Sequence, residues 1–277
     1  MNPDLTERFN QMVEILKKDL RCKGGWHYGS YGRGLSDNYS DYDPVFLISD
    51  QYFNEFAQDV RQIVANVADE LLIFWPENYN DDYFKNFCSV IRIKDSLHQL
   101  DFFLLNHDHL EAWMCRQHLR GCTRPNIIFD RDGEVGALLD QGLRPEDAPP
   151  DLLRAVETYW FHIEMLVKYF KRKDLWKIIK NLDFVFHAHV DVLLAQYNTL
   201  DWGGWETRVK QCVPAEKQHN LAFYFREPDF LALEKALKQA MLAFYEDSVE
   251  VCRQKGIANP HAVAQQIMAY FTEEVSG

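Results

Sequence analysis

The sequence predicts an α+β protein in which a mixed β-sheet domain with flanking helices is followed by a C-terminal helical bundle. Three observations support this fold class. Helix and strand patterns are mixed over residues 1 to about 125, whereas only helical spacing is evident after about residue 150. A proline-containing segment at residues 144–150 separates the two patterns. We therefore expect two domains, residues 1–145 and residues 146–277.

The first domain is expected to contain the order helix, strand, strand, helix, strand, strand. Apolar residues at helical spacing predict a helix over residues 1–20. A short aromatic run at 24–30 predicts a strand that ends in a tight turn, and 45–49 predicts a second strand. Helical spacing returns over 52–74. Residues 89–105 predict two more strands joined by a turn.

The second domain is predicted to be helical throughout. Residues 151–175, 175–197 and 229–254 all have apolar positions at helical spacing and few β-branched runs. Amphipathic helices of this length bury their apolar stripes against one another, so we expect a bundle.

Composition limits the classes of partner. The formal net charge of −12 would repel a polyanion, so we expect no nucleic-acid partner, whereas a cationic small molecule would be attracted. No apolar run reaches the roughly 18 residues of a membrane span, and the N-terminus lacks the pattern of a signal peptide. We expect a cytoplasmic protein without a membrane partner, and a homodimer remains open.

The cysteines form neither a zinc motif nor a disulfide framework, because no CxxC pair occurs and no secretion signal is present. We expect buried or half-buried thiols at Cys22, Cys88, Cys115, Cys122, Cys212 and Cys252.

The most informative stretch is residues 29–43, GSYGRGLSDNYSDYD. Its glycines let the backbone turn tightly against a ligand, and exposed amides there could bind phosphate oxygens. Asp41 and Asp43 are two residues apart, so on a strand both carboxylates share a face and Tyr42 points to the other. Adjacent carboxylates repel each other, and a divalent cation such as Mg²⁺ relieves that repulsion.

A third carboxylate follows in the run QLDFFLL, where Asp101 is the only charge. An unpaired carboxylate in a buried strand is costly, and Asp101 shares a face with Phe103 and Leu105. A two-metal displacement uses a further carboxylate from a neighbouring strand. The sequence therefore predicts a metal site at Asp41, Asp43 and Asp101.

These residues resemble the nucleotidyltransferase superfamily related to DNA polymerase β, whose signature is Gly-Ser, a spacer, Asp-x-Asp and a later acidic residue. In length and layout the chain is similar to the aminoglycoside and lincosamide nucleotidyltransferases, which have a catalytic domain followed by a helical one. The resemblance implies that Asp41, Asp43 and Asp101 are catalytic residues and Mg²⁺ ligands. It also implies that Gly29 and Ser30 contact a nucleoside triphosphate.

The implied reaction is the Mg²⁺-dependent transfer of AMP from ATP, or of another nucleotide, to a hydroxyl of an aminoglycoside or lincosamide. Asp101, Glu164 and Asp174 are candidates for the general base. One alternative is a toxin–antitoxin component that nucleotidylates a protein partner, although the long helical half is unusual for that class. A non-catalytic nucleotide binder is the other, and the three aspartates argue against it.

Further residues near the motif have two interpretations each. Arg33 either contacts phosphate or solvates the turn, and Ser40 either helps to bind nucleotide or braces the carboxylate strand. Lys168 either neutralises triphosphate, as cations of the helical domain do in related enzymes, or complements a helix dipole. Asp37 is interpreted as an Asx-turn residue. Pro44 predicts an edge or distorted strand, because proline cannot donate to a sheet ladder.

Residues 201–206, DWGGWE, interrupt the helical pattern. They form either a packed interhelical loop or an acceptor pocket. In the second case Trp202 or Trp205 stacks on a sugar, and Asp201 or Glu206 meets its ammonium groups.

Two other patterns are not interpreted as metal sites. His187 and His189 are two apart on a predicted helix and do not share a face. Residues 129–135, FDRDGEV, lack most of a calcium-loop pattern, so we expect a turn between extended segments.

Overall fold

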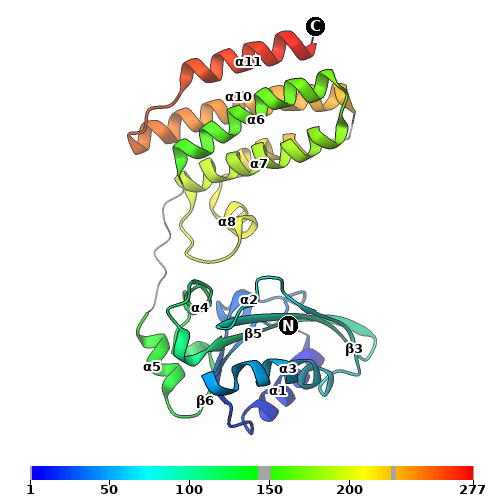
Figure 1. Cartoon of the computed structure of the whole chain (residues 1–277), viewed down its shortest axis with the longest axis vertical. Coiled ribbons are helices and arrows are strands. Elements are labelled where there is room, and N and C mark those ends of the chain that lie inside the picture. The colour runs from blue at the N-terminus through cyan, green and yellow to red at the C-terminus, as the bar shows by residue number, and fades with distance from the viewer. Residues whose placement is uncertain (1, 143–150, 226–228, 277) are drawn as a thin grey trace. The chain divides into compact units, whose positions relative to one another are not determined.

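The computed structural model describes residues 2–142, 151–225 and 229–276. Its contacts divide the chain into two compact units, Met1–Glu146 (unit 1) and Asp147–Gly277 (unit 2). Unit 1 contains a β-sheet and unit 2 contains helices (Figure 1), so the predicted α+β class is confirmed. The predicted boundary segment at 144–150 lies outside the described residues.

A six-stranded mixed sheet forms the centre of unit 1, in the order β3-β4-β5-β2-β1-β6. The neighbours β2 and β5 are parallel, and the other neighbouring pairs are antiparallel. The strands are β1 (Cys22–His27), β2 (Pro44–Ile48), β3 (Glu70–Pro76), β4 (Phe84–Ile93), β5 (Ser96–Asn106) and β6 (Ile127–Asp130).

Helices cover both faces of this sheet. Core residues of α1 (Pro3–Leu16) and α3 (Phe53–Ala65) pack with one face. Core residues of α4 (Trp113–Leu119) and α5 (Glu134–Asp140) pack with the other. A one-turn helix, α2 (Gly29–Gly32), directly follows β1. Short 3₁₀ turns are η1 (Asp50–Tyr52), η2 (His107–His109), η3 (Arg124–Asn126) and, in unit 2, η4 (Ala222–Tyr224).

The long helix predicted over 52–74 is wrong in its second half. Helix α3 ends at Ala65, and Glu70–Pro76 form the edge strand β3. The aromatic and β-branched side chains of this run favour a strand, and antiparallel pairing with β4 decides the outcome. The first helix likewise ends at Leu16, which leaves Leu20 outside it with 77% of its surface exposed.

Three further expectations near the sheet need correction. The first strand occupies Cys22–His27, and the end of its predicted range folds into α2. Strand β2 lies inside the sheet, and Pro44 is its first residue, a position where the missing N–H is tolerated. The 129–135 turn leads from β6 into α5, with Gly133 at φ +78°, rather than into a second extended segment.

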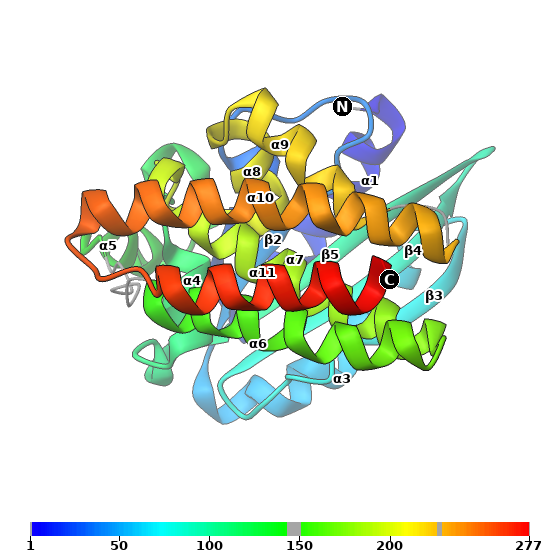
Figure 2. The ribbon, with the colours of Figure 1, turned by 90° about the horizontal axis from the view of Figure 1, so that it is seen from above.

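Unit 2 is a helical bundle, as predicted. Asp151, Asp174 and Asp229 cap its three longest helices by accepting backbone N–H groups in the first turn. Figure 2 shows α6, α10 and α11 side by side within this unit. The helices are α6 (Leu152–Lys171), α7 (Leu175–Tyr197), α8 (Trp205–Cys212), α9 (Ala215–Leu221), α10 (Phe230–Lys255) and α11 (His261–Ser276).

The cysteines are free thiols, and all six are buried or half-buried as predicted. Within the described ranges, no helix combines the length and the apolar character needed to cross a membrane.

Candidate active site

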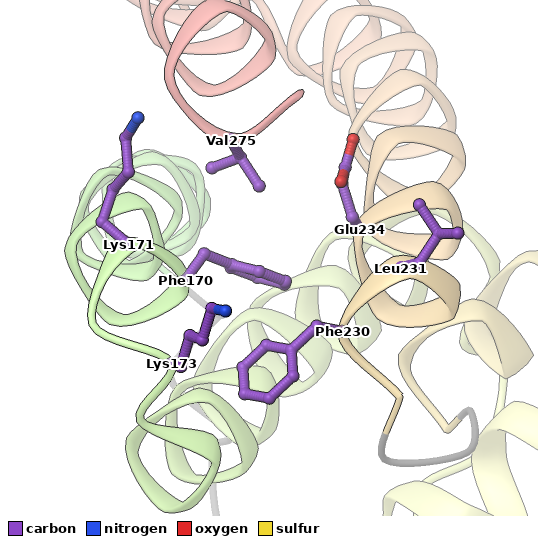
Figure 3. Close-up of a pocket in the computed structure, with 7 residues that line it drawn as sticks. All are labelled: Phe170, Lys171, Lys173, Phe230, Leu231, Glu234 and Val275. Atoms are coloured by element: carbon purple, nitrogen blue, oxygen red, sulfur yellow. The ribbon is translucent and has the colours of Figure 1, made fainter. Parts of the chain in front are cut away.

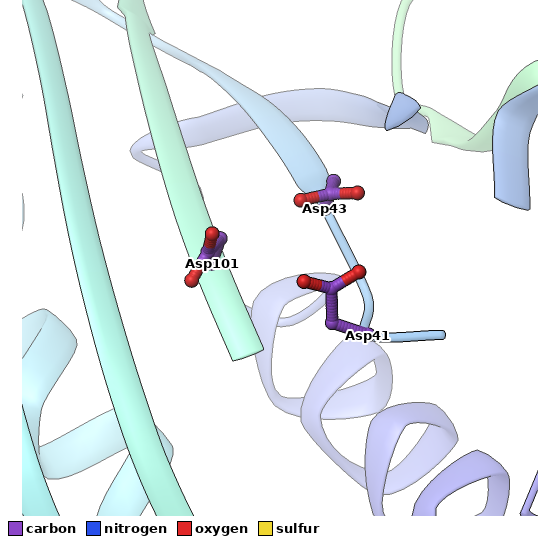
Figure 4. Close-up of side chains that lie close together, drawn as sticks. All are labelled: Asp41, Asp43 and Asp101. Atoms are coloured by element: carbon purple, nitrogen blue, oxygen red, sulfur yellow. The ribbon is translucent and has the colours of Figure 1, made fainter. Parts of the chain in front are cut away.

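Three aspartates come together where β2 begins beside β5 (Figure 4). Asp41 and Asp43 directly precede β2, and Asp101 lies on β5. A parallel bridge between Tyr42 and Leu100 continues the pairing of the two strands, which places Asp43 beside Asp101. One carboxylate oxygen from each of the three lies within 4.8 Å of the others. The sequence predicted these three residues, and the parallel register brings them together.

Tyr42 fixes the direction of the two neighbouring carboxylates. Its side chain is 1% exposed and stacks on Phe9 with ring centroids 4.1 Å apart. Its hydroxyl donates a hydrogen bond to Thr6 Oγ1 at 3.2 Å. Because the Tyr42 side chain packs in the core between the sheet and α1, Asp41 and Asp43 must point to the opposite face of the sheet.

Asp101 is fixed by hydrogen bonds from a neighbouring side chain of its own strand and by a backbone bond to the segment before β2. The Gln99 side chain donates from Nε2 to both carboxylate oxygens, at 3.1 and 3.2 Å, and the backbone N–H of Asp101 donates to the carbonyl of Tyr42 at 3.0 Å. Gln99 was not predicted as part of the site. The signal that could have found it is its position two residues before Asp101, on the same strand face.

The three carboxylates have no cationic partner in the part of the chain that the structure describes, where no ion pair involves them. Burial raises the pKa of Asp43 to about 7, and the charges of Asp41 and Asp101 add to this shift. Burial also raises the pKa of Asp101, although the Gln99 hydrogen bonds oppose the increase. Clustered oxygen ligands with unrelieved repulsion fit a hard divalent cation such as Mg²⁺.

The glycine turn contacts this cluster directly. Gly29 has φ +58°, and a Cβ there would overlap the carboxylate of Asp43, so only glycine fits. The backbone N–H of Tyr28 donates to the carbonyl of Asp43 at 3.1 Å. Ser30 lies in the first turn of α2, next to Gly29. The backbone thus brings the two halves of the motif together.

The other motif residues mainly stabilise the loop. Arg33 donates to the carbonyls of Gly29 and Arg120, at 3.4 and 3.0 Å. Asp37 Oδ1 accepts the backbone N–H of Tyr39 at 2.8 Å, which confirms the predicted Asx turn. Ser40 Oγ accepts the N–H of Asp37 at 2.8 Å. Direct contact of Arg33 or Ser40 with a nucleotide stays a prediction.

In unit 2, Lys168 pairs with Glu164 at 3.2 Å, so a cation and a candidate base named from the sequence neutralise each other. Asp174 caps α7, and the Lys177 side chain, with Nζ 3.0 Å from Oδ2, lowers the pKa of Asp174. Lys171 and Lys173, at the C-terminal end of α6, line a pocket of about 260 Å³, which Figure 3 shows with Phe170, Lys171, Lys173, Phe230, Leu231, Glu234 and Val275. Lys171 pairs with Glu274 at 3.1 Å.

The DWGGWE segment is divided between a loop and a helix. Trp205 begins α8 and packs edge-on against Phe186 and His187, with ring centroids 5.1 and 5.4 Å away, yet stays 37% exposed. The carbonyl of Trp202 accepts from Arg208 at 3.2 Å. These contacts suit the interpretation as a packed segment, and acceptor contacts by Trp202, Trp205, Asp201 and Glu206 stay predictions.

A buried polar network in unit 2 was not predicted. His189 is fully buried, with Nε2 2.9 Å from Asp247 and Nδ1 2.9 Å from the Tyr224 hydroxyl. Asp247 also pairs with Lys217 at 2.6 Å. His187, by contrast, is only half-buried and lies 3.4 Å from Asp183. As expected from their spacing, the two histidines point to different surroundings.

A family model described as streptomycin adenylyltransferase matches residues 5–274. An aminoglycoside 6-adenyltransferase structure from Bacillus subtilis has 12% sequence identity and a TM-score of 0.46, with 100% of each chain covered. A structure from H. pylori, provisionally described as a nucleotidyltransferase, has 11% identity and a TM-score of 0.30 over 92% of this chain and 99% of that chain. No curated protein matches.

Proposed function

The chain belongs to the streptomycin adenylyltransferase family and is a nucleotidyltransferase, and we propose that it transfers AMP from ATP to a hydroxyl of an aminoglycoside. Pyrophosphate is the second product. A lincosamide is the alternative acceptor. The family match includes both units, which supports a small-molecule acceptor over a protein partner. Use of ATP would imply a cytoplasmic location.

The observation that carries this proposal is the cluster of Asp41, Asp43 and Asp101 beside the glycine turn. The three carboxylates are close together, partly buried and without a cationic partner among the described residues. Repulsion of this kind destabilises a fold unless a ligand compensates it. Mg²⁺ held there would neutralise charge on the phosphates and orient them.

In the proposed reaction, the acceptor oxygen forms a bond to the α-phosphorus of ATP. The bond from that phosphorus to the oxygen bridging to the β-phosphorus breaks, and pyrophosphate leaves with the bridging oxygen. Gly29 and Ser30 would hold the departing phosphates next to Asp43. These residues act by positioning and charge stabilisation rather than by forming a covalent intermediate.

The hydroxyl proton must pass to a base. Asp101 is the candidate that the contacts favour, because it lies beside the other two aspartates and burial raises its pKa. Asp174 is occupied as a helix cap, with a lowered pKa, and Glu164 is paired with Lys168.

The test is a pyrophosphate-release assay of the purified full chain with Mg²⁺. ATP, GTP, CTP and UTP are each combined with streptomycin, other aminoglycosides and lincosamides. We expect release only with ATP and an aminoglycoside, and a mass increase of the acceptor by one adenylyl group. Absence of release with every aminoglycoside would contradict the proposed acceptor.

A further inference from the structure

The glycine turn at α2 is bonded to a distant segment of unit 1, residues 120–126, which we call the η3 loop. This loop connects α4 to β6. Strands β1 and β6 are antiparallel, with Trp26 opposite Ile127. The end of β1, where the chain enters α2, therefore lies beside the start of β6, where the η3 loop ends.

Asn126 makes the first link between the loop and the turn. Its side chain is buried, at 8% exposure, and Nδ2 donates a hydrogen bond to the carbonyl of Gly32, the last residue of α2. At the other end of the amide, Oδ1 accepts the backbone N–H of Thr123 at 2.7 Å and the Thr123 hydroxyl at 3.0 Å. Because both ends of the amide are bonded, its orientation is fixed.

Arg33 makes the second link. Its guanidinium donates to the carbonyl of Gly29 at 3.4 Å and to the carbonyl of Arg120 at 3.0 Å. The η3 loop is shaped around this side chain, because Gly121 has φ +67° and a Cβ there would lie 2.9 Å from Arg33 Nη2. The loop thus contacts both ends of the glycine turn.

These bonds fix the direction of the amides in the turn. A peptide group is planar, so a carbonyl that is held in place also fixes the N–H of the next residue. Bonding of the Gly29 carbonyl fixes the N–H of Ser30, and bonding of the Gly32 carbonyl fixes the end of α2. Amides bind phosphate oxygens well only when their N–H groups are already oriented.

From these contacts we infer that Asn126 is a positioning residue for nucleotide binding, which acts through Gly32 to hold the glycine turn in the conformation that receives phosphates. The inference rests on the proposed function, because it takes Gly29 and Ser30 as the residues that hold the phosphates. Asn126 was not singled out from the sequence, where 94 residues separate it from Gly32.

Asn181 in unit 2 offers a matched control. It is also buried, at 5% exposure, and its Nδ2 also donates to a backbone carbonyl, that of Lys177, at 2.8 Å. Its Oδ1 is likewise bonded, to His162 Nδ1 at 2.7 Å. The two asparagines differ in the element whose carbonyl they bind, a helix of the bundle or the glycine turn.

The experiment measures Kd for ATP with Mg²⁺ by titration calorimetry on the full chain, so that no acceptor is needed. Asn126→Ala should raise this Kd about tenfold, because the Gly32 carbonyl loses its buried donor and the turn is released. Asn181→Ala loses an equivalent bond and should leave the Kd within about twofold of the wild-type value. Both substitutions are neutral, so the charge that faces the phosphates is unchanged.

A second pair of variants tests the same loop without changing Asn126. Gly121→Ala and Gly256→Ala both place alanine at φ +67°, but only at Gly121 does the Cβ meet another side chain, that of Arg33. Gly121→Ala should raise the Kd about threefold, because Arg33 must leave its position between the loop and the turn. Gly256→Ala should leave it unchanged.

Unchanged Kd in both Asn126→Ala and Gly121→Ala would overturn the inference and leave the proposed function intact. An equal rise in the control variants would overturn it too, because the effect would then follow from general destabilisation. If the wild-type chain bound none of ATP, GTP, CTP and UTP, the proposed function itself would be contradicted.

Discussion

Asp43 in unit 1 is half-buried and Asp247 in unit 2 is buried, and the surroundings of the two carboxylates are opposite. Asp43 has Asp41 and Asp101 as neighbours, and its pKa is raised to about 7. Asp247 is 3% exposed and bonds both His189 and Lys217. Burial alone would raise the pKa of Asp247, yet these two partners outweigh it, and the net pKa is lowered.

We interpret the surroundings of Asp247 as a stabilising network and those of Asp43 as a proposed ligand site. The protein itself compensates the charge of Asp247, and its bonds tie α10 to α7 and α9. At Asp43 the fold brings three negative charges together, and we propose that a bound cation compensates them. Substitutions at the two positions should therefore separate activity from stability.

The largest expected effect is on catalysis at Asp43. Asp43→Asn should lower the rate of pyrophosphate release by about 10³-fold, because an electrostatic group at the reacting phosphate is lost. The free energy of unfolding in urea should not fall, since repulsion from Asp41 and Asp101 is relieved. Asp183→Asn, at an exposed aspartate of α7, is the control. A clear loss of stability in Asp43→Asn would mean that this residue is structural.

Asp247→Ala should give the reverse result. The variant leaves Lys217 and His189 without their buried partner, so the free energy of unfolding should fall by about 3–5 kcal/mol. Urea denaturation measures this, and adding Lys217→Met should recover part of the loss. A decrease under about 1 kcal/mol would show that the network is not a stabilising one.

The pH dependence of stability should distinguish the two carboxylates further. The folded pKa of Asp43 is raised from 3.8 to about 7, so without metal the folded state binds the proton more tightly. Protonation of Asp43 therefore contributes to the free energy of unfolding at low pH. This contribution is lost as pH rises from about 4 to about 7, at a rate of at most about 1.4 kcal/mol per pH unit. Asp247, with a lowered pKa, contributes in the opposite sense.

Urea unfolding across this pH range, compared between wild type and Asp43→Asn, measures the contribution of Asp43. The variant should lack the decline between about pH 4 and 7. Identical pH profiles would contradict the raised pKa.

The smallest expected effect concerns the glycine turn. Gly29→Ala and Gly133→Ala both place alanine at positive φ, +58° and +78°. This should cost about 1 kcal/mol of stability at Gly133, and more at Gly29, where the Cβ also overlaps Asp43. Only Gly29→Ala should also reduce the turnover rate, because its Cβ overlaps Asp43 while nothing lies near the Cβ position of Gly133. Equal activity in the two variants would contradict a role of Gly29 in placing Asp43.

The sequence was sufficient for the carboxylate cluster, because the alternation of Asp41, Tyr42 and Asp43 is a local property of extended backbone. Asp101 was recognisable as the only charge in its apolar run. The partner that holds it, Gln99, has an ordinary polar side chain at an unremarkable position, and only the hydrogen bonds reveal its role.

The sequence-based predictions were wrong or incomplete where the structure depends on pairing between distant parts of the chain. Leu71 and Leu72 continue the helical spacing of α3, so only pairing with β4 shows that they belong to a strand. The network of His189, Lys217 and Asp247 joins helices far apart in the chain, and no local pattern connects them. Local pattern thus predicted the clustered aspartates better than it predicted the buried network of unit 2.

We propose that Asp41, Asp43 and Asp101 together hold a divalent cation for nucleotide transfer. The most direct test is a crystal structure with Mn²⁺ and a non-hydrolysable ATP analogue, with anomalous scattering used to locate manganese. We expect a manganese peak coordinated by these carboxylates, with the analogue's phosphates at Gly29 and Ser30. Manganese and analogue bound away from these aspartates would contradict it.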